Sequence, residues 1–385
     1  IPGGMLLGWN GCEFGWGIIC VDLAGKKLWG SKTNGVLLAN DGKRYFAYDP
    51  AGFQSAPGIQ VFDLADRRPL NFGAGSPTLL APPGGDKVSD LATGLAYAAG
   101  KVYVSYAKRN LIGIFDAVSG TLVGTWTAPV PGALAARPDG TLVGISAGAL
   151  VSLIDGKPVA LNTTDLAAPA GVTVAGDGTI YVTNGGTMQD VAVLAADGKL
   201  LRRIGKSGGR PAIGAYDASG LYTPAGLAMD ANGRLWVAEH ADSPKRVSVW
   251  NSGSGAFEKE YFGGSSYFGY AYINPAVPNE IYCHNVLWRV DWEKNTTTPI
   301  STIWRKTSPD MMHAPDPAGY PKGFRSITAS NGKQYGLGSD GFVSNIVYRR
   351  DGDLFKPFMS TFVVSSTKNW SLWHDIGIPV LDDPA

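Results

Sequence analysis

The sequence lacks long apolar runs and an excess of either charge. No apolar stretch approaches the ~20 residues that a helix needs to cross a bilayer, so we expect no membrane span. The 33 Lys and Arg residues nearly balance the 32 Asp and Glu residues, which leaves a net charge of +1. This balance gives no electrostatic reason to bind nucleic acid or an acidic membrane surface.

Several catalytic motifs are also absent. The chain has no G-x-x-x-x-G-K-[ST] phosphate loop and no C-x-x-C-H haem-attachment motif. Ser371, His374 and Asp375 are close in sequence, but a catalytic triad is defined by geometry in space. On an extended strand His374 and Asp375 would point to opposite faces, so these residues do not predict a triad.

Glycine and proline, in contrast, are abundant. The 52 glycines and 25 prolines suit a chain that turns every few residues rather than a helical protein. Residues 169–182 align with residues 224–237 without a gap, matching Gly178 with Gly233 and Tyr181 with Trp236. Each stretch predicts a strand, a tight Asp-Gly or Asn-Gly turn, and a second strand.

The same template recurs along the chain. It is found at residues 35–49, 94–106, 133–146, 271–283 and 326–338. A third strand that often ends in Asp and a more polar fourth strand follow each copy. Four strands with a new unit every ~35–55 residues are typical of propeller blades.

The sequence therefore predicts one all-β domain over residues 1–385, a β-propeller of four-stranded antiparallel blades. Seven units fit within residues 34–362, and residues 1–32 look like the later strands of an eighth. Residues 363–377 are expected to supply the missing inner strand, so that the N- and C-terminal strands close the ring and leave no free edge. We expect eight blades, with seven as the alternative.

Residues 224–239 (PAGLAMDANGRLWVAE), 244–251 (PKRVSVWN) and 257–263 (FEKEYFG) resemble the NHL-repeat pattern, and the other units resemble it or its YVTN and PQQ relatives more loosely. The resemblance implies blade architecture but no single function, because such propellers include scaffolds, lyases, lactonases and sugar dehydrogenases. Residues 208–250 also resemble secreted bacterial NHL proteins without an assigned activity.

In this architecture the first strand of each blade lines the central channel. The loops that leave the second strands share one face, here called the loop face, with the loops that lead into the first strands. The second strands are expected to end at Tyr48, Tyr106, Ser146, Asn184, Glu239, Asn285 and Gly338. With the adjacent His240, Asp242 and His284, these residues predict a polar mouth. The alternative is that they are ordinary solvated strand ends.

Two long loops are expected on the same face, residues 207–226 and 306–324. Long ordered loops in compact repeats are often functional. Their Arg210, Tyr216, Tyr222, His313 and Tyr320 suit a binding surface, since Tyr and Arg are enriched at interfaces. Alternatively, the loops only cover the channel mouth.

A metal site is a second hypothesis for this mouth. Glu239, Asn184, His240 and His284 are its candidate ligands for Ca²⁺ or another divalent metal. No further ligand can be placed, and no H-x-x-x-H spacing fixes the geometry. Asp351-Gly-Asp353 lacks the later ligands of a calcium loop and predicts a hairpin turn instead.

Cysteines and sequons bear on location. Cys12 and Cys20 lie in a glycine-containing segment that can fold back, which predicts a disulfide or, alternatively, two unpaired thiols, and Cys283 has no evident partner. Sequons begin at Asn162, Asn295 and Asn369. Together with the low charge they favour an extracellular or periplasmic protein. Because the chain begins at Ile1, we expect a processed or truncated product.

The sequence leads to two alternative hypotheses about function. The first is a secreted scaffold that binds a protein or glycan partner through its loop face, within a larger extracellular assembly and without a cofactor. The alternative is a metal-dependent propeller enzyme, of the lactonase or lyase kind, with its site at the channel mouth.

Overall fold

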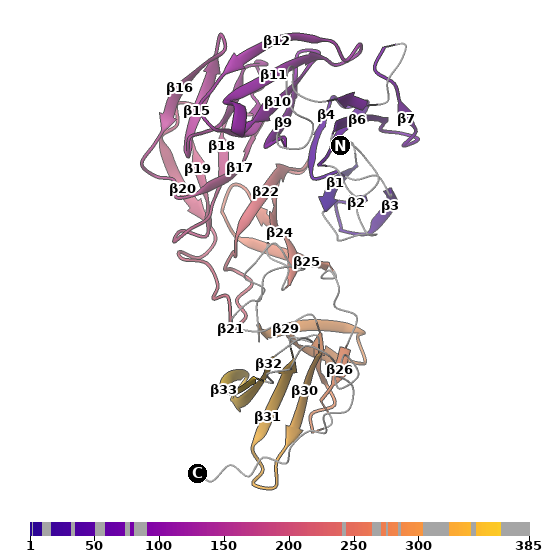
Figure 1. Cartoon of the computed structure of the whole chain (residues 1–385), viewed down its shortest axis with the longest axis vertical. Coiled ribbons are helices and arrows are strands. Elements are labelled where there is room, and N and C mark those ends of the chain that lie inside the picture. The colour runs from indigo at the N-terminus through magenta and orange to yellow at the C-terminus, as the bar shows by residue number, and fades with distance from the viewer. Residues whose placement is uncertain are drawn as a thin grey trace. The chain divides into compact units, whose positions relative to one another are not determined.

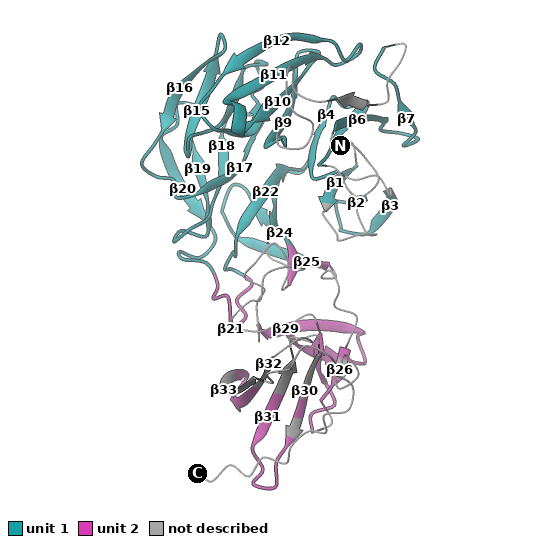
Figure 2. Ribbon diagram, viewed as in Figure 1, with its two compact units in different colours: residues 1–209, 219–240, 247–261 teal, residues 210–218, 241–246, 262–385 magenta. Residues whose placement is uncertain are grey.

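A computed structural model describes residues 1, 3–9, 17–31, 35–50, 58–73, 78–80, 91–240, 244–263, 271–274, 276–283, 286–302, 323–339 and 344–362. The chain divides into two compact units (Figure 2). Unit 1 comprises Ile1–Gly209, Ser219–His240 and Val247–Tyr261, and unit 2 comprises Arg210–Ala218, Ala241–Arg246 and Phe262–Ala385. That residues 1–385 form a single domain stays a prediction.

Unit 1 is built from six antiparallel sheets, numbered 1 to 6 along the chain (Figure 1). Sheet 1 consists of β1 (Gly4–Trp9), β2 (Gly17–Asp22) and β3 (Lys27–Ser31). Sheet 2 consists of β4 (Leu37–Asn40), β5 (Arg44–Asp49), β6 (Gly58–Asp63), β7 (Pro69–Leu70) and β8 (Thr78–Leu80). Sheet 3 consists of β9 (Gly94–Ala98), β10 (Lys101–Tyr106), β11 (Leu111–Asp116) and β12 (Leu122–Thr127). Sheet 4 consists of β13 (Pro131–Ala136), β14 (Leu142–Ser146), β15 (Ala149–Ile154) and β16 (Lys157–Asn162). Sheet 5 consists of β17 (Pro169–Val174), β18 (Ile180–Asn184), β19 (Asp190–Leu194) and β20 (Leu200–Ile204). Sheet 6 consists of β22 (Pro224–Met229), β23 (Arg234–Glu239), β24 (Lys245–Asn251) and β25 (Phe257–Gly263). A short 3₁₀ helix, η1 (Ala107–Arg109), joins β10 to β11.

Unit 2 is built from sheets 7 and 8. Sheet 7 consists of β26 (Ala271–Ile273), β27 (Glu280–Cys283), β28 (Val286–Asp291) and β29 (Thr296–Thr302), with β21 (Gly214–Ala215) at its edge. Sheet 8 consists of β30 (Gly323–Thr328), β31 (Gln334–Ser339), β32 (Ser344–Asp351) and β33 (Leu354–Phe362). An apolar cluster of Tyr282, Leu287, Tyr348 and Phe355 joins the two sheets.

The described part of the chain therefore contains eight antiparallel sheets and no helix beyond a single 3₁₀ turn. This confirms the all-β propeller class and the predicted count of eight units. Sheets 3 to 6 and sheet 8 are four-stranded in chain order, as expected for blades. Among the described residues sheet 1 has three strands, in the order β1-β2-β3. That residues 1–32 form part of a four-stranded unit stays a prediction.

Recurring Asp residues hold the turn between the third and fourth strands. The Asp116 carboxylate accepts hydrogen bonds from the backbone N–H groups of Val118 and Ser119 at 3.1 and 2.7 Å. Asp63 accepts from Ala65 and Asp66 in the same way. These bonds satisfy backbone groups that the tight turn leaves unpaired, which explains why the third strands end in Asp.

A second carboxylate, Asp230, holds the turn between β22 and β23. Burial alone would raise the pKa of Asp230, but hydrogen bonds from the Trp236 indole, from Arg234 and from the Asn232 N–H outweigh burial and lower it. The Arg234 guanidinium also donates to the Leu23 carbonyl of sheet 1 at 2.8 Å. Asp230 therefore orients an arginine that joins sheet 6 to sheet 1.

This lowered pKa makes a pH-dependent contribution to stability. Because the folded state holds the Asp230 carboxylate more tightly than the unfolded chain, its contribution is present above the ordinary value of 3.8 and is lost as the pH falls through the folded value. We expect Asp230→Asn to lower the free energy of unfolding at pH 7. The difference in this free energy between the parent protein and the variant should become smaller as the pH falls below 3.8. Urea titrations at pH 7 and pH 3 measure this, and an equal difference at both pH values would contradict it.

Apolar side chains pack each sheet of unit 1 against its neighbours. Along a strand they alternate between the two sides, so that Ile180 and Val182 pack on sheet 4 while Tyr181 packs on sheet 6. Clusters of this kind join sheets 1 and 2, 2 and 3, 3 and 4, 4 and 5, and 5 and 6. A further cluster joins sheet 6 to sheet 1 through Trp236, Val249, Met5 and Val21.

Sheet 6 thus packs against sheet 1 within unit 1, a pairing that the sequence did not indicate. The first strands of sheets 2 to 6 lie side by side in the order β4, β9, β13, β17, β22 and are called inner strands below. Two glycines show how tightly these strands converge. A Cβ on Gly94 would lie 2.1 Å from the Gly132 carbonyl oxygen, and one on Gly171 would lie 2.1 Å from the Ala225 oxygen. Residues 363–377, the expected inner strand of sheet 1, lie outside the described residues.

Cys20 is a buried free thiol in β2, and burial raises its pKa. This does not support the predicted Cys12–Cys20 disulfide, although Cys12 itself lies outside the described residues. Cys283, at the end of β27, is also a free thiol. We expect the unreduced protein to release all three of its thiols when unfolded in guanidinium. Titration with a thiol reagent would find only one if the disulfide were present.

Candidate functional site

The residues that end the second strands are buried and fix the segments leading into the inner strands. Tyr48 is 4% exposed, and its hydroxyl accepts a hydrogen bond from the Ala92 N–H at 3.0 Å. Burial raises the pKa of Tyr48, so the hydroxyl stays protonated. Ser146 Oγ donates to the Pro129 carbonyl at 2.6 Å, and Asn184 Oδ1 accepts from the Ala167 N–H at 3.0 Å.

A shared backbone turn adds to this arrangement in sheets 4, 5 and 6. The residue before the first proline of each inner strand has a positive φ: Val130 at 40°, Ala168 at 48° and Thr223 at 48°. Their carbonyls accept hydrogen bonds from the N–H groups of Ala147, Gly185 and His240, which directly follow the second strands. The strained conformation is therefore held in place by the neighbouring strand end.

The structure places the other predicted mouth residues of unit 1 as follows. Tyr106 and Glu239 are buried at the ends of β10 and β23. Tyr222 is half-buried, and His240 is exposed just after β23. Of these four residues, His240 is the exposed one, and the other three are buried or half-buried.

Asn184 belongs to a buried polar network in sheet 5. It is fully buried, and its amide nitrogen donates to Asp190 Oδ1 at 3.0 Å. Asp190 in turn receives Arg203 Nη1 on both oxygens at 3.1 Å, and Arg203 Nη2 donates to the Asp165 carbonyl at 2.8 Å. Each charge is paired and hydrogen-bonded, as a buried ion pair requires.

This network fits the predicted metal site poorly. Asn184 would have to offer its amide oxygen to the ion, but that oxygen accepts the Ala167 N–H. Glu239 and His240 lie in sheet 6, and His284 lies outside the described residues. The part of the chain that the structure describes contains no group of three or more His, Cys, Asp or Glu residues that could hold a metal. Metal binding stays an untested prediction.

The first long loop contributes its middle part, residues 210–218, to unit 2. There β21 adds an edge strand to sheet 7 by pairing with Ser301 and Thr302. Arg210 is 3% exposed, and its guanidinium lies 5.3 Å from the ring centroid of Tyr216. Arg246, also buried, lies 5.9 Å from the same centroid. These side chains stabilise the loop by cation–π contacts. That Arg210 and Tyr216 contact a partner stays a prediction.

Several predicted residues lie outside the described residues. They are Asp242, His284, Asn285, His313 and Tyr320 from the loop face, together with Asn369. Their assignment to a site stays a prediction.

The two described sequons differ. Asn162 is buried, and its amide nitrogen donates to Asp165 Oδ2 at 2.8 Å and to the Gly198 carbonyl at 2.9 Å. The prediction that Asn162 carries a glycan is therefore corrected, because the nitrogen is committed inside the fold. Asn295 is exposed in the turn between β28 and β29 and is sterically free to be modified.

Sequence reasoning missed Gly144-Ile-Ser146-Ala-Gly148, which matches the G-x-S-x-G nucleophile pattern. A nucleophile elbow needs a strand followed by a helix. Here Ser146 ends β14 and β15 begins at Ala149, so the pattern lies in a strand-to-strand hairpin. With Ser146 Oγ bound to the Pro129 carbonyl, the serine is a structural residue.

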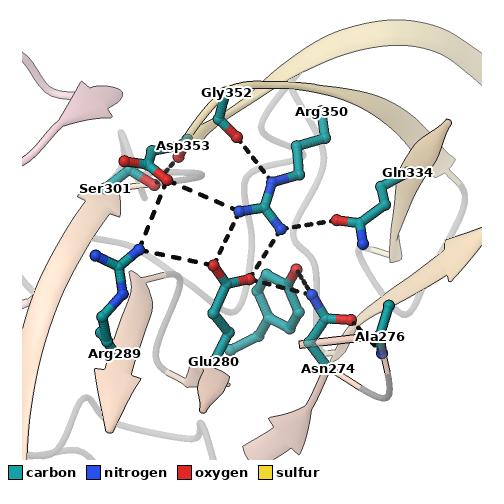
Figure 3. A network of polar contacts seen from close by, with 10 residues as sticks. Asn274, Ala276, Glu280, Arg289, Ser301, Gln334, Arg350, Gly352 and Asp353 are labelled. Carbon is teal, nitrogen blue, oxygen red and sulfur yellow. Dashed lines mark hydrogen bonds and ion pairs between the residues drawn. The ribbon is translucent and has the colours of Figure 1, made fainter. Parts of the chain in front are cut away.

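Sequence reasoning also missed a polar cluster in unit 2 (Figure 3). Glu280, the first residue of β27, is 2% exposed, and Arg350 Nη1 and Nη2 each donate to one of its oxygens at 2.9 Å. Asn274 Nδ2 donates to Glu280 Oε2 at 3.1 Å. Arg350 also donates to Gln334 Oε1 and to the Gly352 carbonyl, both at 2.7 Å. Its hydrogen bonds to Glu280 raise the pKa of Arg350.

The cluster joins sheet 7 to sheet 8 within unit 2. The exposed Arg289 extends it, with Nη2 at 3.9 Å from Glu280 Oε1 and 3.8 Å from Asp353 Oδ1. Only spatial pairing could reveal it, since Glu280 and Arg350 lie 70 residues apart. Fully paired in this way, Glu280 offers no free acid or base, so the cluster serves to hold sheets together.

The fold defines a β-propeller protein, and in its described part the strand-end side chains of Tyr48, Ser146 and Asn184 bond to backbone groups. No protein-family model matches the chain, and no curated protein does either. Among solved structures it is similar to a protein of unknown function from Bacteroides caccae (13% identity, TM-score 0.48, covering 68% of this chain and 94% of that one). It is also similar to a chain of a nidogen–laminin complex (17%, 0.42, 67% and 92%) and to BamB from Moraxella catarrhalis (15%, 0.34, 62% and 67%). Because these TM-scores are all below 0.5, the fold assignment rests on the sheets observed in this structure.

Proposed function

We propose that this chain is an NHL-like scaffold that binds a protein or glycan partner through its loop face outside the cytoplasm. One observation carries the proposal: the polar side chains that end the second strands are buried and bonded to backbone. Tyr48, Ser146 and Asn184 each fix a segment that leads into an inner strand. A face built in this way presents a shaped surface rather than reactive groups.

The alternative, a metal-dependent enzyme at the channel mouth, is less well supported. Its ligand set requires Asn184, whose amide is engaged at both ends. Loop faces held rigidly from beneath suit binding, because a preorganised surface loses little conformational entropy when a partner binds. Location outside the cytoplasm is supported by the low charge and the exposed sequon at Asn295. In the described residues no helix has the length and apolarity to cross a membrane.

Site-specific photo-cross-linking in the producing cell tests the proposal. A photoreactive residue replaces His240, which is exposed on the loop face, and in a matched variant it replaces Lys199, which is exposed at the turn between β19 and β20. We expect a discrete adduct from position 240 alone, containing either protein or glycan. Equal adducts at both positions, or none at position 240, would contradict the proposal. Elemental analysis of the same protein, with and without chelator, tests the enzyme alternative.

A further inference from the structure

Most of the sheets carry features on their outer edges that oppose pairing with a further strand. Lys or Arg residues occur in the fourth strands β3, β16, β20, β25 and β33. Sheet 2 ends in two short strands, β7 and β8, and the edge of sheet 7 is covered by β21. Charged residues, short strands and covering segments are the usual means by which proteins keep an exposed edge from pairing.

Strand β12 has none of these features. It is the outermost strand of sheet 3, and its sequence, LVGTWT, contains no charged residue and no proline. The uncharged run extends on both sides, from Ala117 to Ala136. A bulge lies near the start of the strand, but Gly124–Thr127 pair with Leu111–Ile114 in regular register. The other edge of β12 is therefore a row of backbone donors and acceptors with which no strand among the described residues pairs.

Exposed apolar side chains flank this edge. Val123 is 53% exposed, Leu122 is 41% exposed, and Val118, in the turn that precedes β12, is 65% exposed. Thr125 and Thr127 are exposed as well. Covering apolar area next to an unpaired edge is favourable, and backbone hydrogen bonds to an added strand supply further affinity. The edge therefore fits an extended strand.

Charge narrows the choice of that strand. A charged residue laid against this uncharged edge would lose water without gaining a counter-ion, which costs free energy. An uncharged segment with strand-forming residues meets no such cost, and β12 is itself a segment of this kind. The edge thus complements a second copy of itself.

We propose that β12 pairs antiparallel with β12 of a second copy of this chain, forming a dimer through the outer edge of sheet 3. A two-fold axis at Thr125 would place this residue opposite the second copy's Thr125, and Gly124 opposite the second copy's Trp126. Two threonines opposite one another can hydrogen-bond across the strands, and no like charges meet. The pairing does not use the loop face, so it stands or falls independently of the proposed function.

Analytical ultracentrifugation of the full chain, from micromolar to submillimolar concentrations, tests the dimer. We expect a mass of twice 40.5 kDa at the upper concentrations. Thr125→Lys would place two like charges opposite each other at the axis and should raise the dissociation constant about tenfold or more. Val159→Lys is the matched control, because Val159 is 47% exposed on the fourth strand β16 of sheet 4, and it should leave the constant unchanged. Thermal midpoints of unfolding equal to that of the parent show that both variants are folded.

Hydrogen exchange on the parent protein locates the contact without relying on a variant. The β12 amides that are not bonded to β11 should exchange about tenfold or more slowly above the dissociation constant than below it, since pairing protects them. The amides of β16 should exchange at the same rate at both concentrations. A parent that stays monomeric, a dimer that Thr125→Lys leaves intact, or β12 amides without concentration-dependent protection would each overturn the proposal. A monomer whose β12 amides are protected only by another protein would also overturn it, and would show that the edge accepts a strand of different sequence.

Discussion

Gly171→Ala is expected to destabilise unit 1 by about 3 kcal/mol, the upper part of the range for overpacked interiors. The added Cβ would lie 2.1 Å from the Ala225 oxygen and 2.8 Å from Leu227 Cδ2. The nearer atom belongs to the backbone of the adjacent inner strand, which cannot move without disturbing sheet 6. Alanine lowers the entropy of the unfolded chain, but that gain is only about 0.4–1 kcal/mol. The steric term therefore decides the sign.

Urea unfolding followed by tryptophan fluorescence measures this effect, because Trp250 is buried between sheets 5 and 6. Gly132→Ala is the matched control. Gly132 also lies in an inner strand, but a Cβ there would be no closer than 3.5 Å to Ile145. It should be neutral or slightly stabilising. If the two variants unfolded at the same urea concentration, the inference that the inner strands approach closely at Gly171 would be wrong.

Arg350→Leu is expected to destabilise unit 2 by about 3 kcal/mol, the lower part of the range for breaking a buried ion pair. The substitution would leave Glu280 buried at 2% exposure, and its carboxylate would keep the hydrogen bond from Asn274 Nδ2 at 3.1 Å. Arg289, 3.9 Å away and half exposed, compensates for part of the lost charge. This remaining cation is why we place the effect at the lower end.

A double-mutant cycle isolates the pair from other effects of the substitution. Glu280→Leu with Arg350→Leu should recover most of the lost stability, because removing both charges also removes the penalty of burying one alone. Arg289→Leu is the control, and its exposed ion pair should contribute less than about 1 kcal/mol. Additive effects of the two single substitutions would show that Glu280 and Arg350 do not act as a pair.

The blade units could be predicted because their signals are local. The Asp-Gly and Asn-Gly turns, the alternation along strands and the Asp at the end of the third strand each depend on neighbouring residues. The correspondence of residues 169–182 with 224–237 thus became the equivalent strand pairs β17–β18 and β22–β23. The prediction that residues 1–32 contain the later strands of a unit also rests on local pattern.

The loop-face residues show where local reasoning stops. The position of Asn184 at a strand end was predictable, but its role was not, because the Ala167 N–H and Asp190 reach it only after the hairpin forms. The Glu280–Arg350 pair joins residues from different sheets and leaves no spacing signal in the chain. A sequon marked Asn162 as a modification site, and only its burial showed that its amide nitrogen is engaged.

The sequence by itself determined that this protein is a series of eight antiparallel strand units, since turn chemistry and strand periodicity act over a few residues. Only the tertiary structure decided which units pack together, namely that sheet 6 meets sheet 1 through Trp236 and Met5. It also decided which polar groups are buried. These outcomes depend on contacts between distant segments, whose geometry is set when the sheets pack and is not encoded in any single repeat.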